Sequence, residues 1–454
     1  MVARFLLACY PIAGHLHPHL AVAHALKTQG HEVAFYTGAA AQSQVEREGF
    51  VFFPFHPEMD ARLTRIWQPA EGGSLAEDLP IMKRAIFQIG AIRATLAEWF
   101  LGTVPQQIDD LRALLARWQP DVLVSDISLW GPILVLSETA AIPVAAFCVL
   151  FACPLPGPDA PTWGRGLPPP HTWPARLRSK LEQVIQDWVL GEFRERASAL
   201  RQSYGLAPLA GPVMAHAGTL PLFLLAGAPE LDYDRRDLPP TVHYAGPCLW
   251  HRSAQEAPPA WLLALPKDRP VVHVTEGTVH TRQPLVLRAA AQGLGNLPME
   301  VIMSTGKARR VEELDLGPLA ANIRVEQYVA HGDLFPHTAV VVTTGGPGTV
   351  LTALAAGVPL VIVPTGWDHI ENAQRIVYAG VGVSLPPQKC TAATLAAAVQ
   401  KILADPAYRR NAQRMAEALQ RQGGPDHAAA LLEELLHAPK PPVAPTPRLH
   451  KVLT

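Results

Sequence analysis

The stretch VVVTTGGPGT at residues 340–349 is the most informative part of the sequence. A run of β-branched residues, expected to be a buried strand, meets a glycine-rich turn, and a helix is expected to open near Thr349. N–H groups at a helix N-terminus lack backbone partners and face the positive end of the helix dipole, so the turn suits a phosphate group. Gly345, Gly346 and Gly348 would let the backbone adopt positive φ angles and approach a ligand.

This turn differs from two better-known phosphate-binding turns. No Lys-Ser/Thr pair follows it, as a P-loop requires, and its spacing is not the GxGxxG fingerprint of dinucleotide-binding proteins. A turn that only saves space has a similar composition. Phosphate binding therefore needs support from other segments.

Short apolar runs alternate with longer helical patterns on both sides of the turn. From residue 270 onward the expected strands are 271–274, 300–303, 323–325, 340–342 and 360–363, and the expected helices are 284–294, 349–356 and 395–404. Before residue 246 the expected strands are 5–9, 32–36, 122–124 and 142–147, and the expected helices are 20–29 and 108–118. Alternation of this kind is typical of βα units around a parallel sheet. The sequence therefore predicts an α/β protein with two Rossmann-like, doubly wound parallel sheets.

The two series divide the chain into units. We expect an N-terminal domain at residues 1–245 and a C-terminal domain at residues 270–438. The proline-rich stretch 246–269 between them is predicted to be an interdomain linker. Residues 439–454 are rich in proline and show no periodic pattern, so they are predicted to be a flexible tail.

The composition bounds the class of protein. Of 454 residues, 49% are hydrophobic and 17% are charged, which is enough apolar material for large cores. The formal net charge is -1, which gives no electrostatic argument for a nucleic-acid partner. Five scattered cysteines without a CxxC pair predict a cytoplasmic location. The most apolar stretch, residues 139–152, is shorter than the roughly 20 residues of a membrane span.

A long loop is expected at residues 154–174. It contains eight prolines, three glycines, Trp163 and Trp173. A loop of this length in a compact domain is usually functional or mobile, and its aromatic side chains would suit the wall of a binding site. The alternative is a surface excursion without a role.

A second candidate segment is PTGWDHIENA at residues 364–373, which follows the strand expected at 360–363. Ligands bind at the carboxyl ends of parallel strands, so Asp368 and His369 would reach the same cleft as the glycine turn. A carboxylate and a neighbouring donor can fix sugar hydroxyls by directional hydrogen bonds. Alternatively, Asp368 caps a helix that starts near Glu371.

A third candidate is GHLHPH at residues 14–19, directly after the first strand. A histidine there is a natural general base, and Asp126 at the end of the strand 122–124 is its best orienting partner. The simpler alternative is a structural loop histidine. The HxHxH spacing also suggests a zinc hydrolase, although Pro18 interrupts the alternation and no second HxH is found.

Taken together, these segments resemble the inverting glycosyltransferases of the GT-B type, specifically the large family-1 group that glycosylates natural products, lipids and antibiotics. The resemblance covers nearly the whole chain. Gly14-His15 followed by Pro18 resembles the catalytic segment of the family, and VSD at 124–126 resembles the segment that carries the Asp partner. The further matching segments are PELDY at 229–233, YAGP at 244–247, TEGT at 275–278, VEQYVAH at 325–331, LFP at 334–336, the glycine turn, AGVP at 356–359 and Asp368-x-x-x-Asn372-Ala373.

The resemblance implies a role for each matching residue. His15 would take the proton of the acceptor hydroxyl, and Asp126 would hold its imidazole. Tyr328 and His331 would contact the nucleobase. Asp368 and His369 would bind the donor sugar. The implied donor contacts as a whole are Thr278, Tyr328, His331, Thr344, Gly345, Gly346, Gly348, Thr349, Trp367, Asp368 and His369.

The implied reaction moves a hexose or deoxyhexose from a UDP- or dTDP-sugar to a hydroxyl of a hydrophobic small molecule, with inversion. The donor would lie on the C-terminal domain and the acceptor on the N-terminal one, where Trp163 and Trp173 would contact it. The resemblance implies no metal and no cofactor besides the nucleotide sugar, and no nucleic-acid partner or integral membrane span.

Several positions depart from the family pattern. Thr344 stands where a His usually contacts the diphosphate, and losing a charge-assisted contact could cost roughly 1–3 kcal/mol. Arg282 or another residue would then have to compensate. An Asp-Gln pair at the sugar reads Asp368-His369 here. The other departures are Thr352 for a ribose-binding Glu, His331 for a Gln and Ala330 for a Pro.

These departures leave alternatives open. One is a non-catalytic or weakly active sugar-nucleotide-binding protein on the same fold, in which Thr344 would mark the loss of activity. C-glycosylation and sugar-nucleotide epimerisation are two others. The acceptor, the choice between UDP and dTDP, and the oligomeric state are also open at this point.

Overall fold

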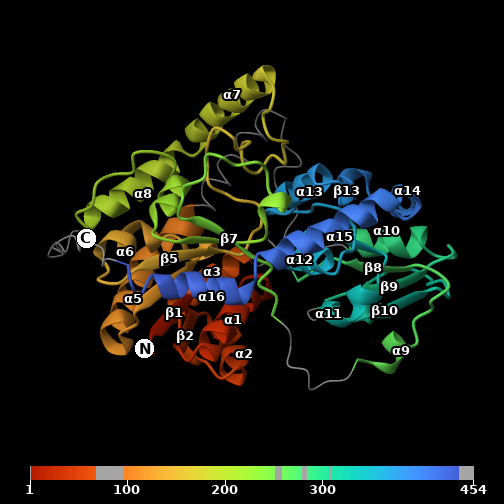
Figure 1. The fold of residues 1–454 in the computed structure, drawn as a ribbon, viewed down its shortest axis with the longest axis horizontal. Coiled ribbons are helices and arrows are strands. Elements are labelled where there is room, and N and C mark those ends of the chain that lie inside the picture. The colour runs from red at the N-terminus through yellow and green to blue at the C-terminus, as the bar shows by residue number, and fades with distance from the viewer. Residues whose placement is uncertain (1, 68–96, 251–257, 279–283, 307–308, 439–454) are drawn as a thin grey trace.

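Two parallel sheets frame the protein in a computed structural model, which describes residues 2–67, 97–250, 258–278, 284–306 and 309–438. Figure 1 shows the N-terminal sheet, coloured from red through orange to green, beside the C-terminal sheet, coloured from green to blue. Arg282, the expected tail 439–454 and part of the expected linker lie outside the described residues.

The N-terminal sheet has seven strands in the order β3-β2-β1-β4-β5-β6-β7, and every neighbouring pair is parallel. Its strands are β1 (Arg4–Ala8), β2 (Glu32–Thr37), β3 (Val51–Pro54), β4 (Val122–Asp126), β5 (Val144–Cys148), β6 (Phe223–Ala226) and β7 (Val242–Gly246). Its helices are α1 (Ala13–Thr28), α2 (Gln42–Arg47), α3 (Pro57–Trp67), α5 (Val104–Trp118), α6 (Ile133–Thr139), α7 (Trp173–Val189) and α8 (Gly191–Ser203).

The C-terminal sheet has six parallel strands in the order β10-β9-β8-β11-β12-β13. Its strands are β8 (Val271–Thr275), β9 (Glu300–Ser304), β10 (Ile323–Glu326), β11 (Val340–Thr343), β12 (Leu360–Ile362) and β13 (Gly382–Ser384). The helices of this half are α9 (Ala260–Leu263), α10 (Leu285–Gly293), α11 (His331–Leu334), α12 (Pro347–Ala355), α13 (His369–Tyr378), α14 (Ala392–Ala404), α15 (Pro406–Arg421) and α16 (Pro425–Glu434).

Short turns of helix connect these elements. One of them is π-helical and the others are 3-10 helices. They are η1 (Ala39–Ala41), η2 (Glu98–Gly102), η3 (Ile127–Leu129), η4 (Val213–Thr219), η5 (Pro229–Leu231), η6 (Val311–Glu313), η7 (Phe335–His337) and η8 (Pro387–Lys389). The expected α/β class with two doubly wound sheets is confirmed.

Helices cover both faces of each sheet, which explains the continuous apolar runs in the strands. In β1, Leu6 and Ala8 belong to one hydrophobic cluster, with α5 and α6. Phe5 and Leu7 point to the opposite face and join a cluster that contains α1 and α16. That second cluster continues into α12, α15 and β12, so one core runs through both halves of the molecule.

The last helix crosses back to the first half. Residues 270–438 are expected as one unit, but α16 packs on α1 and β7. In Figure 1 the blue helices α15 and α16 run from the C-terminal sheet back over the red and orange half. The apolar side chains of α16, including Leu431 and Leu432, provide the reason, because they are buried in the cluster shared with α1.

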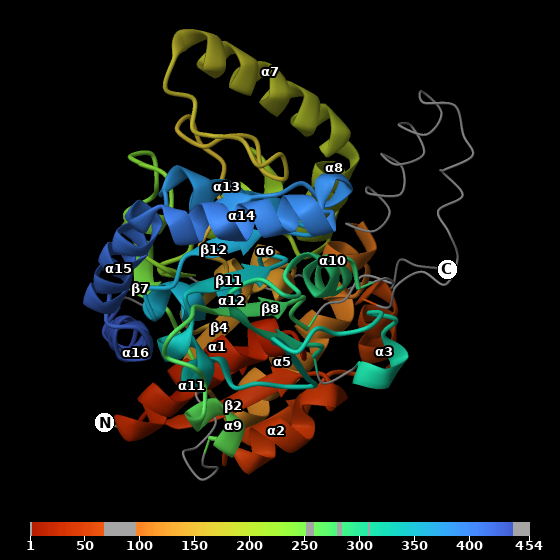
Figure 2. The same ribbon diagram turned by 90° about the vertical axis from the view of Figure 1, so that its right-hand side faces the viewer.

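Three local expectations differ from the structure. The first helix begins at Ala13 instead of residue 20, and it contains Pro18. The loop expected at 154–174 ends earlier, because Trp173 opens α7. The arm formed by α7 and α8, which stands above the sheets in Figures 1 and 2, was not expected. Within the described part of the chain, no helix combines the length and apolar character needed to cross a bilayer.

Candidate active site

The strand order reverses at one point in each sheet, and several of the predicted site residues follow the strands at these points. In the N-terminal sheet the reversal lies between β1 and β4, where His15 follows β1 and Asp126 ends β4. In the C-terminal sheet it lies between β8 and β11, which lead to Thr278 and to the glycine turn. Open parallel sheets bind ligands outside the carboxyl ends of strands at such reversals.

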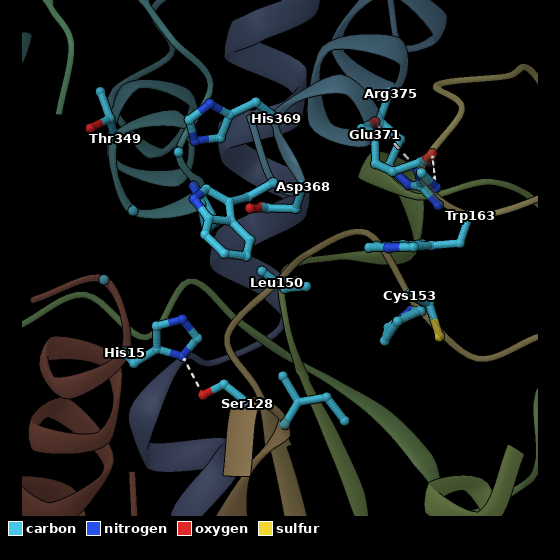
Figure 3. A pocket seen from close by; sticks show the side chains of 18 of the residues that line it. His15, Ser128, Leu150, Cys153, Trp163, Thr349, Asp368, His369, Glu371 and Arg375 are labelled. Atoms are coloured by element: carbon cyan, nitrogen blue, oxygen red, sulfur yellow. Dashed lines mark hydrogen bonds and ion pairs between the residues drawn. The ribbon is translucent and has the colours of Figure 1, made fainter. Parts of the chain in front are cut away.

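His15 and Asp126 form a close pair. Nδ1 of His15 lies 2.8 Å from Oδ2 and 3.1 Å from Oδ1 of Asp126. His15 lies in the first turn of α1, which begins before the helix expected at residues 20–29. An ionised carboxylate can only accept, so Nδ1 carries the proton and Nε2 is left as an acceptor. Figure 3 shows the His15 ring facing the cavity.

Ser128 completes this pair, although nothing in the sequence singled it out. Its backbone N–H and its hydroxyl both donate to Oδ1 of Asp126 at 2.7 Å. Its Oγ also lies 3.3 Å from Nδ1 of His15. A serine two residues after an aspartate is a common turn pattern, and that spacing is the only signal that could have identified it.

The pair perturbs the pKa of both groups. Burial alone lowers the pKa of His15, but the charge and hydrogen bond of Asp126, with a further contribution from Asp368, raise it above its usual value. Burial raises the pKa of Asp126, but the imidazole of His15 and the other donors outweigh burial and lower it to about 2. His15 is therefore a stronger base than a free imidazole.

The other two histidines of the HxHxH segment have different surroundings: His17 also lines the cavity, and Nδ1 of His19 lies 3.9 Å from Oδ2 of Asp126. The ring of His17 lies against Trp250, with 4.6 Å between centroids. His19 is buried against Phe147, and its Nδ1 lies 2.8 Å from the carbonyl oxygen of His15. Among the described residues, no three His, Cys, Asp or Glu side chains are grouped as a metal site requires. The HxHxH alternative finds no support in this part of the chain.

A cavity of about 2560 Å³ separates His15 from the glycine turn. A pocket for one drug-sized molecule usually measures about 300–1,000 Å³, so this cavity has room for two substrates. The predicted residues that line it are His15, Trp163, Thr278, Tyr328, His331, Thr344, Gly346, Gly348, Thr349, Trp367, Asp368 and His369. Asp126 and Gly345 lie behind this wall.

The glycine turn presents the start of α12 to the cavity. Only Gly345 has a positive φ, of 102°, and a Cβ there would lie 2.8 Å from Cγ2 of Ile362. The positive φ expected for Gly346 and Gly348 is wrong, because Gly346 has φ -60° and Gly348 lies inside α12. An added Cβ on Gly348 would meet no protein atom within 4 Å, so this glycine leaves the cavity open.

Thr344 does not offer its hydroxyl proton to the cavity. Its Oγ1 donates to the carbonyl oxygen of Glu276 at 3.2 Å, and the residue is buried. A hydroxyl has one proton to donate, so in this arrangement Thr344 cannot also donate to a diphosphate. Glu276 is itself held in place, because its carboxylate accepts from the backbone N–H of Val286 and pairs with Arg309.

The start of α13 brings a carboxylate to the opposite side of the same turn. Nδ2 of Asn372 donates to Oδ2 of Asp368 at 2.6 Å and to the carbonyl oxygen of Gly345 at 2.8 Å. The helix begins at His369, earlier than expected, and the side chain of Asp368 does not cap it, so the capping interpretation is wrong. Burial lowers the pKa of His369, although the charge of Asp368 acts in the opposite direction. The lowered pKa favours the neutral ring.

Comparisons with known proteins show the family of this chain. Residues 288–435 match the family model described as the C-terminal domain of erythromycin biosynthesis protein CIII-like. 4'-Demethylrebeccamycin synthase of Lentzea aerocolonigenes is 34% identical over 438 residues, which cover 96% of this chain and 100% of the relative. The chain belongs to the GT-B family-1 glycosyltransferases of natural products.

More distant proteins share the sequence or the fold over similar lengths. Demethyllactenocin mycarosyltransferase of Streptomyces fradiae is 28% identical over 96% of this chain and 86% of its own length. The solved glycotransferase of kitacinnamycin superposes with a TM-score of 0.71 at 21% identity, over 96% of this chain and 99% of that one. The glycosyltransferase SsfS6 of Streptomyces sp. SF2575, complexed with thymidine diphosphate, has a TM-score of 0.62 at 23% identity, over 95% and 99%.

The residues predicted at the nucleobase follow β10 of the glycosyltransferase. Tyr328 is 48% exposed on the cavity wall. His331 stacks on Phe335, with 4.5 Å between ring centroids and 15° between planes. Burial lowers the pKa of His331 to about 4, so its ring is neutral at physiological pH. Flat, uncharged rings beside an open volume suit a stacked nucleobase.

The two tryptophans predicted to contact the acceptor lie in different places in the structure of the enzyme. Trp163 lines the cavity, and Arg375 lies 5.9 Å from its ring centroid. Trp173 opens α7 with 77% of its surface exposed, and it is not part of the cavity wall. The side chains of α7 that do reach the cavity are mostly polar or charged, among them Gln183 and Gln186, although Ile185 and Val189 also line it. Trp173 is therefore wrongly placed as a cavity-wall residue.

Proposed function

We propose that the enzyme moves a hexose or deoxyhexose from UDP or dTDP to a hydroxyl group of a hydrophobic natural product, with inversion at the anomeric carbon. The observation that carries this proposal is the His15–Asp126 pair facing the start of α12 across one cavity. The names of the relatives, which include a demethylrebeccamycin synthase and a mycarosyltransferase, support a natural-product acceptor.

In the proposed step, His15 acts as the general base. The acceptor oxygen attacks the anomeric carbon while Nε2 of His15 takes its proton, and the bond from that carbon to the diphosphate oxygen breaks. The bonding electrons leave with the nucleoside diphosphate. Asp126 stabilises the imidazolium that forms, as the raised pKa of His15 indicates. A single displacement of this kind inverts the configuration.

The C-terminal half supplies the binding site for the leaving group. The first N–H groups of α12 have no partner within the helix and face the cavity near Gly348 and Thr349. Their partial positive charge stabilises the negative charge that develops on the diphosphate. Asp368, held by Asn372, is placed to accept hydrogen bonds from the sugar hydroxyls. dTDP is supported by the related structure that contains thymidine diphosphate.

An apolar wall supports a hydrophobic acceptor. The apolar side chains that line the cavity include Ile127, Trp130, Leu150, Leu155, Trp163 and Phe193. Apolar walls with a few polar groups are typical of small-molecule sites. The non-catalytic alternative, which depends on Thr344, is less well supported because the His15–Asp126 pair is intact.

Product analysis tests this proposal. Purified enzyme is incubated with UDP- and dTDP-hexoses of known α configuration and a panel of hydroxylated polycyclic aromatic and macrolide acceptors. We expect glycosylated product with a β linkage, read from the anomeric proton coupling, together with one equivalent of nucleoside diphosphate. Retained configuration would rule out the single displacement, and a C-linked product would replace the proposed hydroxyl acceptor with a carbon nucleophile.

A further inference from the structure

The loop that carries Trp163 is anchored to a carboxylate from the other half of the chain. Oε1 of Glu371, on α13, accepts hydrogen bonds from three successive backbone N–H groups. The distances are 2.8 Å to Gly164, 3.0 Å to Arg165 and 2.8 Å to Gly166. Glu371 is 1% exposed and lies at the cavity wall, so these bonds are made to a buried carboxylate.

The two glycines explain how three neighbouring N–H groups reach one oxygen. Gly164 has φ +84° and Gly166 has φ +56°, conformations that residues with a side chain rarely adopt. Such backbone turns form an anion-binding nest, and here the anion is a side chain of the protein itself. A Cβ on Gly166 would lie 2.5 Å from Cγ1 and 2.9 Å from the carbonyl oxygen of Ile370, so only glycine allows the loop to approach α13.

A buried ion-pair network holds Glu371 in position. Its second oxygen, Oε2, lies 3.0 Å from Nη1 of Arg375, and Nε of Arg375 lies 2.6 Å from Oδ1 of Asp232. Oδ2 of Asp232 accepts from the hydroxyl of Tyr244 at 3.0 Å and from the N–H of Cys153 at 3.1 Å. Buried charges are tolerated only when their hydrogen bonds are complete, so this network specifies one arrangement.

The network also fixes the aromatic wall of the cavity. The guanidinium of Arg375 lies 4.2 Å from the ring centroid of Tyr233 and 5.9 Å from that of Trp163. Figure 3 shows Trp163 beside Glu371 and Arg375, with its ring edge toward the cavity. The position of Trp163 therefore depends on whether the loop is docked on α13.

The same turn of α13 faces the proposed donor site. Asp368 and His369 precede Glu371 by three and two residues, and both line the cavity. Asn372 follows Glu371 and joins Asp368 to the carbonyl oxygen of Gly345 in the glycine turn. A ligand that orders this turn of helix therefore also orders the residue that holds the loop.

We propose that Glu371 and Arg375 are positioning residues that dock the acceptor loop, residues 154–172, on α13, and that a nucleoside diphosphate bound at the glycine turn stabilises the docked loop. This inference rests on the proposed function, because it assumes a nucleotide at that turn. Its consequence is reciprocal: a docked loop raises nucleotide affinity by the same factor by which bound nucleotide stabilises docking. Donor binding thus prepares the acceptor wall before the acceptor arrives.

Hydrogen exchange of the full chain tests the coupling. The exchange rate of peptides that contain the amides of residues 164–166 is measured with and without saturating UDP or dTDP, whichever binds. We expect the nucleotide to slow their exchange by about 5- to 150-fold, the usual range of coupling between two sites. Peptides from α5, on the far side of the N-terminal sheet, serve as the internal reference and should not change.

Two variants weaken the contact between the loop and α13, one from each side. Glu371→Gln removes the charge that the nest and Arg375 require, and Gly166→Ala places a methyl group against Ile370. In both, we expect fast loop exchange that no longer responds to the nucleotide. The dissociation constant of the nucleotide should rise by up to the factor by which it slowed exchange in the wild type. Gly166→Ala leaves the buried ion pairs intact, so it tests the inference if Glu371→Gln does not fold.

Glu230→Gln is the matched control. Glu230 also pairs across the two halves, with Arg421 at 2.8 Å, but both side chains are exposed and lie outside the cavity wall. It should change neither loop exchange nor nucleotide affinity. Two results would overturn this inference and leave the proposed function standing. One is nucleotide binding to the wild type without slower loop exchange. The other is a loss of nucleotide affinity in Glu230→Gln as large as in Glu371→Gln and Gly166→Ala. Absence of binding by any nucleotide would overturn the proposed function and this inference with it.

Discussion

His15 is a strong base because a buried carboxylate is bonded to it. Asp126 is fully buried and directs Nδ1 of His15 inward, which leaves Nε2 facing the cavity. Ser128 donates two hydrogen bonds to the second carboxylate oxygen, which helps to hold the carboxylate in this orientation. The chemistry of the site therefore depends on three side chains that meet only in the folded chain.

The pH dependence of turnover should report this pair. Below the raised pKa of His15 the base is protonated, so kcat/KM falls on the acid side, with a midpoint above the ordinary histidine value of 6.5. Asp126→Asn removes the charge that raises this pKa. We expect the midpoint to move to lower pH and the plateau to fall by about 10²–10⁴-fold. The profile is measured from about pH 5 to 9.

Ser128→Ala is the control for this profile. It keeps the charge of Asp126 but removes one hydrogen bond to it. Its acid midpoint should stay close to that of the wild type. An unchanged midpoint in Asp126→Asn would show that His15 is not the group that titrates.

Replacing Thr344 tests whether its hydroxyl contributes to stability or to nucleotide binding. Thr344→Val keeps the shape of the side chain and removes the hydroxyl that donates to Glu276. We expect a loss of stability of about 0.5–1.5 kcal/mol and a change in nucleotide affinity of less than about threefold. Chemical denaturation and calorimetric titration measure the two effects. A tenfold or greater loss of affinity would mean that the hydroxyl turns to the diphosphate when donor binds.

At the scale of elements, the glycine turn combines a conformational and a steric requirement. Gly345→Ala would force a side chain into a positive φ and against Ile362, so it should destabilise the fold by about 1–3 kcal/mol. Gly348→Ala adds a methyl group to a helical residue with open space around it, so stability should be kept. If the diphosphate approaches at this position, Gly348→Ala should still weaken nucleotide binding by tenfold or more.

The two glycine variants separate folding from binding. Thermal denaturation measures the stability of each variant, and calorimetric titration measures its nucleotide affinity. Full nucleotide affinity in a stable Gly348→Ala would place the diphosphate away from the start of α12, against the proposal.

The strands were predictable because they are buried on both faces and form continuous apolar runs. β8 and β11 lie within a residue of the stretches expected at 271–274 and 340–342. The start of α1 was not, because Pro18 lies inside the helix, where a proline normally interrupts the helical pattern. Trp173 was misplaced for a similar reason, since a proline-rich stretch gave no sign of where α7 begins.

The site was predictable only where a motif is contiguous. The glycine turn, Asp368 and His15 each follow a strand, and the strand order brings them to one cavity. The hydrogen bonds between the loop at Gly164 and Glu371 join residues 207 apart in the chain. No local pattern encodes such a contact, since it depends on how the two halves meet.

At the scale of the whole molecule, the two halves share a core. α16 leaves the C-terminal half and buries Leu432 against the helices of the N-terminal half, including α1, which carries His15. His31 of the N-terminal half bonds to Glu433 of α16 through Nε2. The C-terminal helix therefore stabilises the half of the enzyme that carries His15.

Leu432→Ala tests this dependence. Removing a fully buried leucine should cost about 2–5 kcal/mol of unfolding free energy. Because the core is continuous, calorimetry should show one transition for both halves, shifted to lower temperature. Leu263→Ala, at a leucine that is 72% exposed, should leave the transition in place. Two separate transitions, with only one of them shifted, would show that the halves unfold independently.

The most direct test of the account compares His15→Ala with the wild type in two assays. Calorimetric titration with UDP and dTDP measures donor-site binding, and nucleoside diphosphate release in the presence of acceptors measures transfer. Since His15 lies across the cavity from the glycine turn, we predict nucleotide affinity within about twofold of the wild type and a loss of turnover of at least about 10²-fold. Turnover close to that of the wild type, or a comparable loss of nucleotide affinity, would contradict the assignment of His15 as the acceptor-side base.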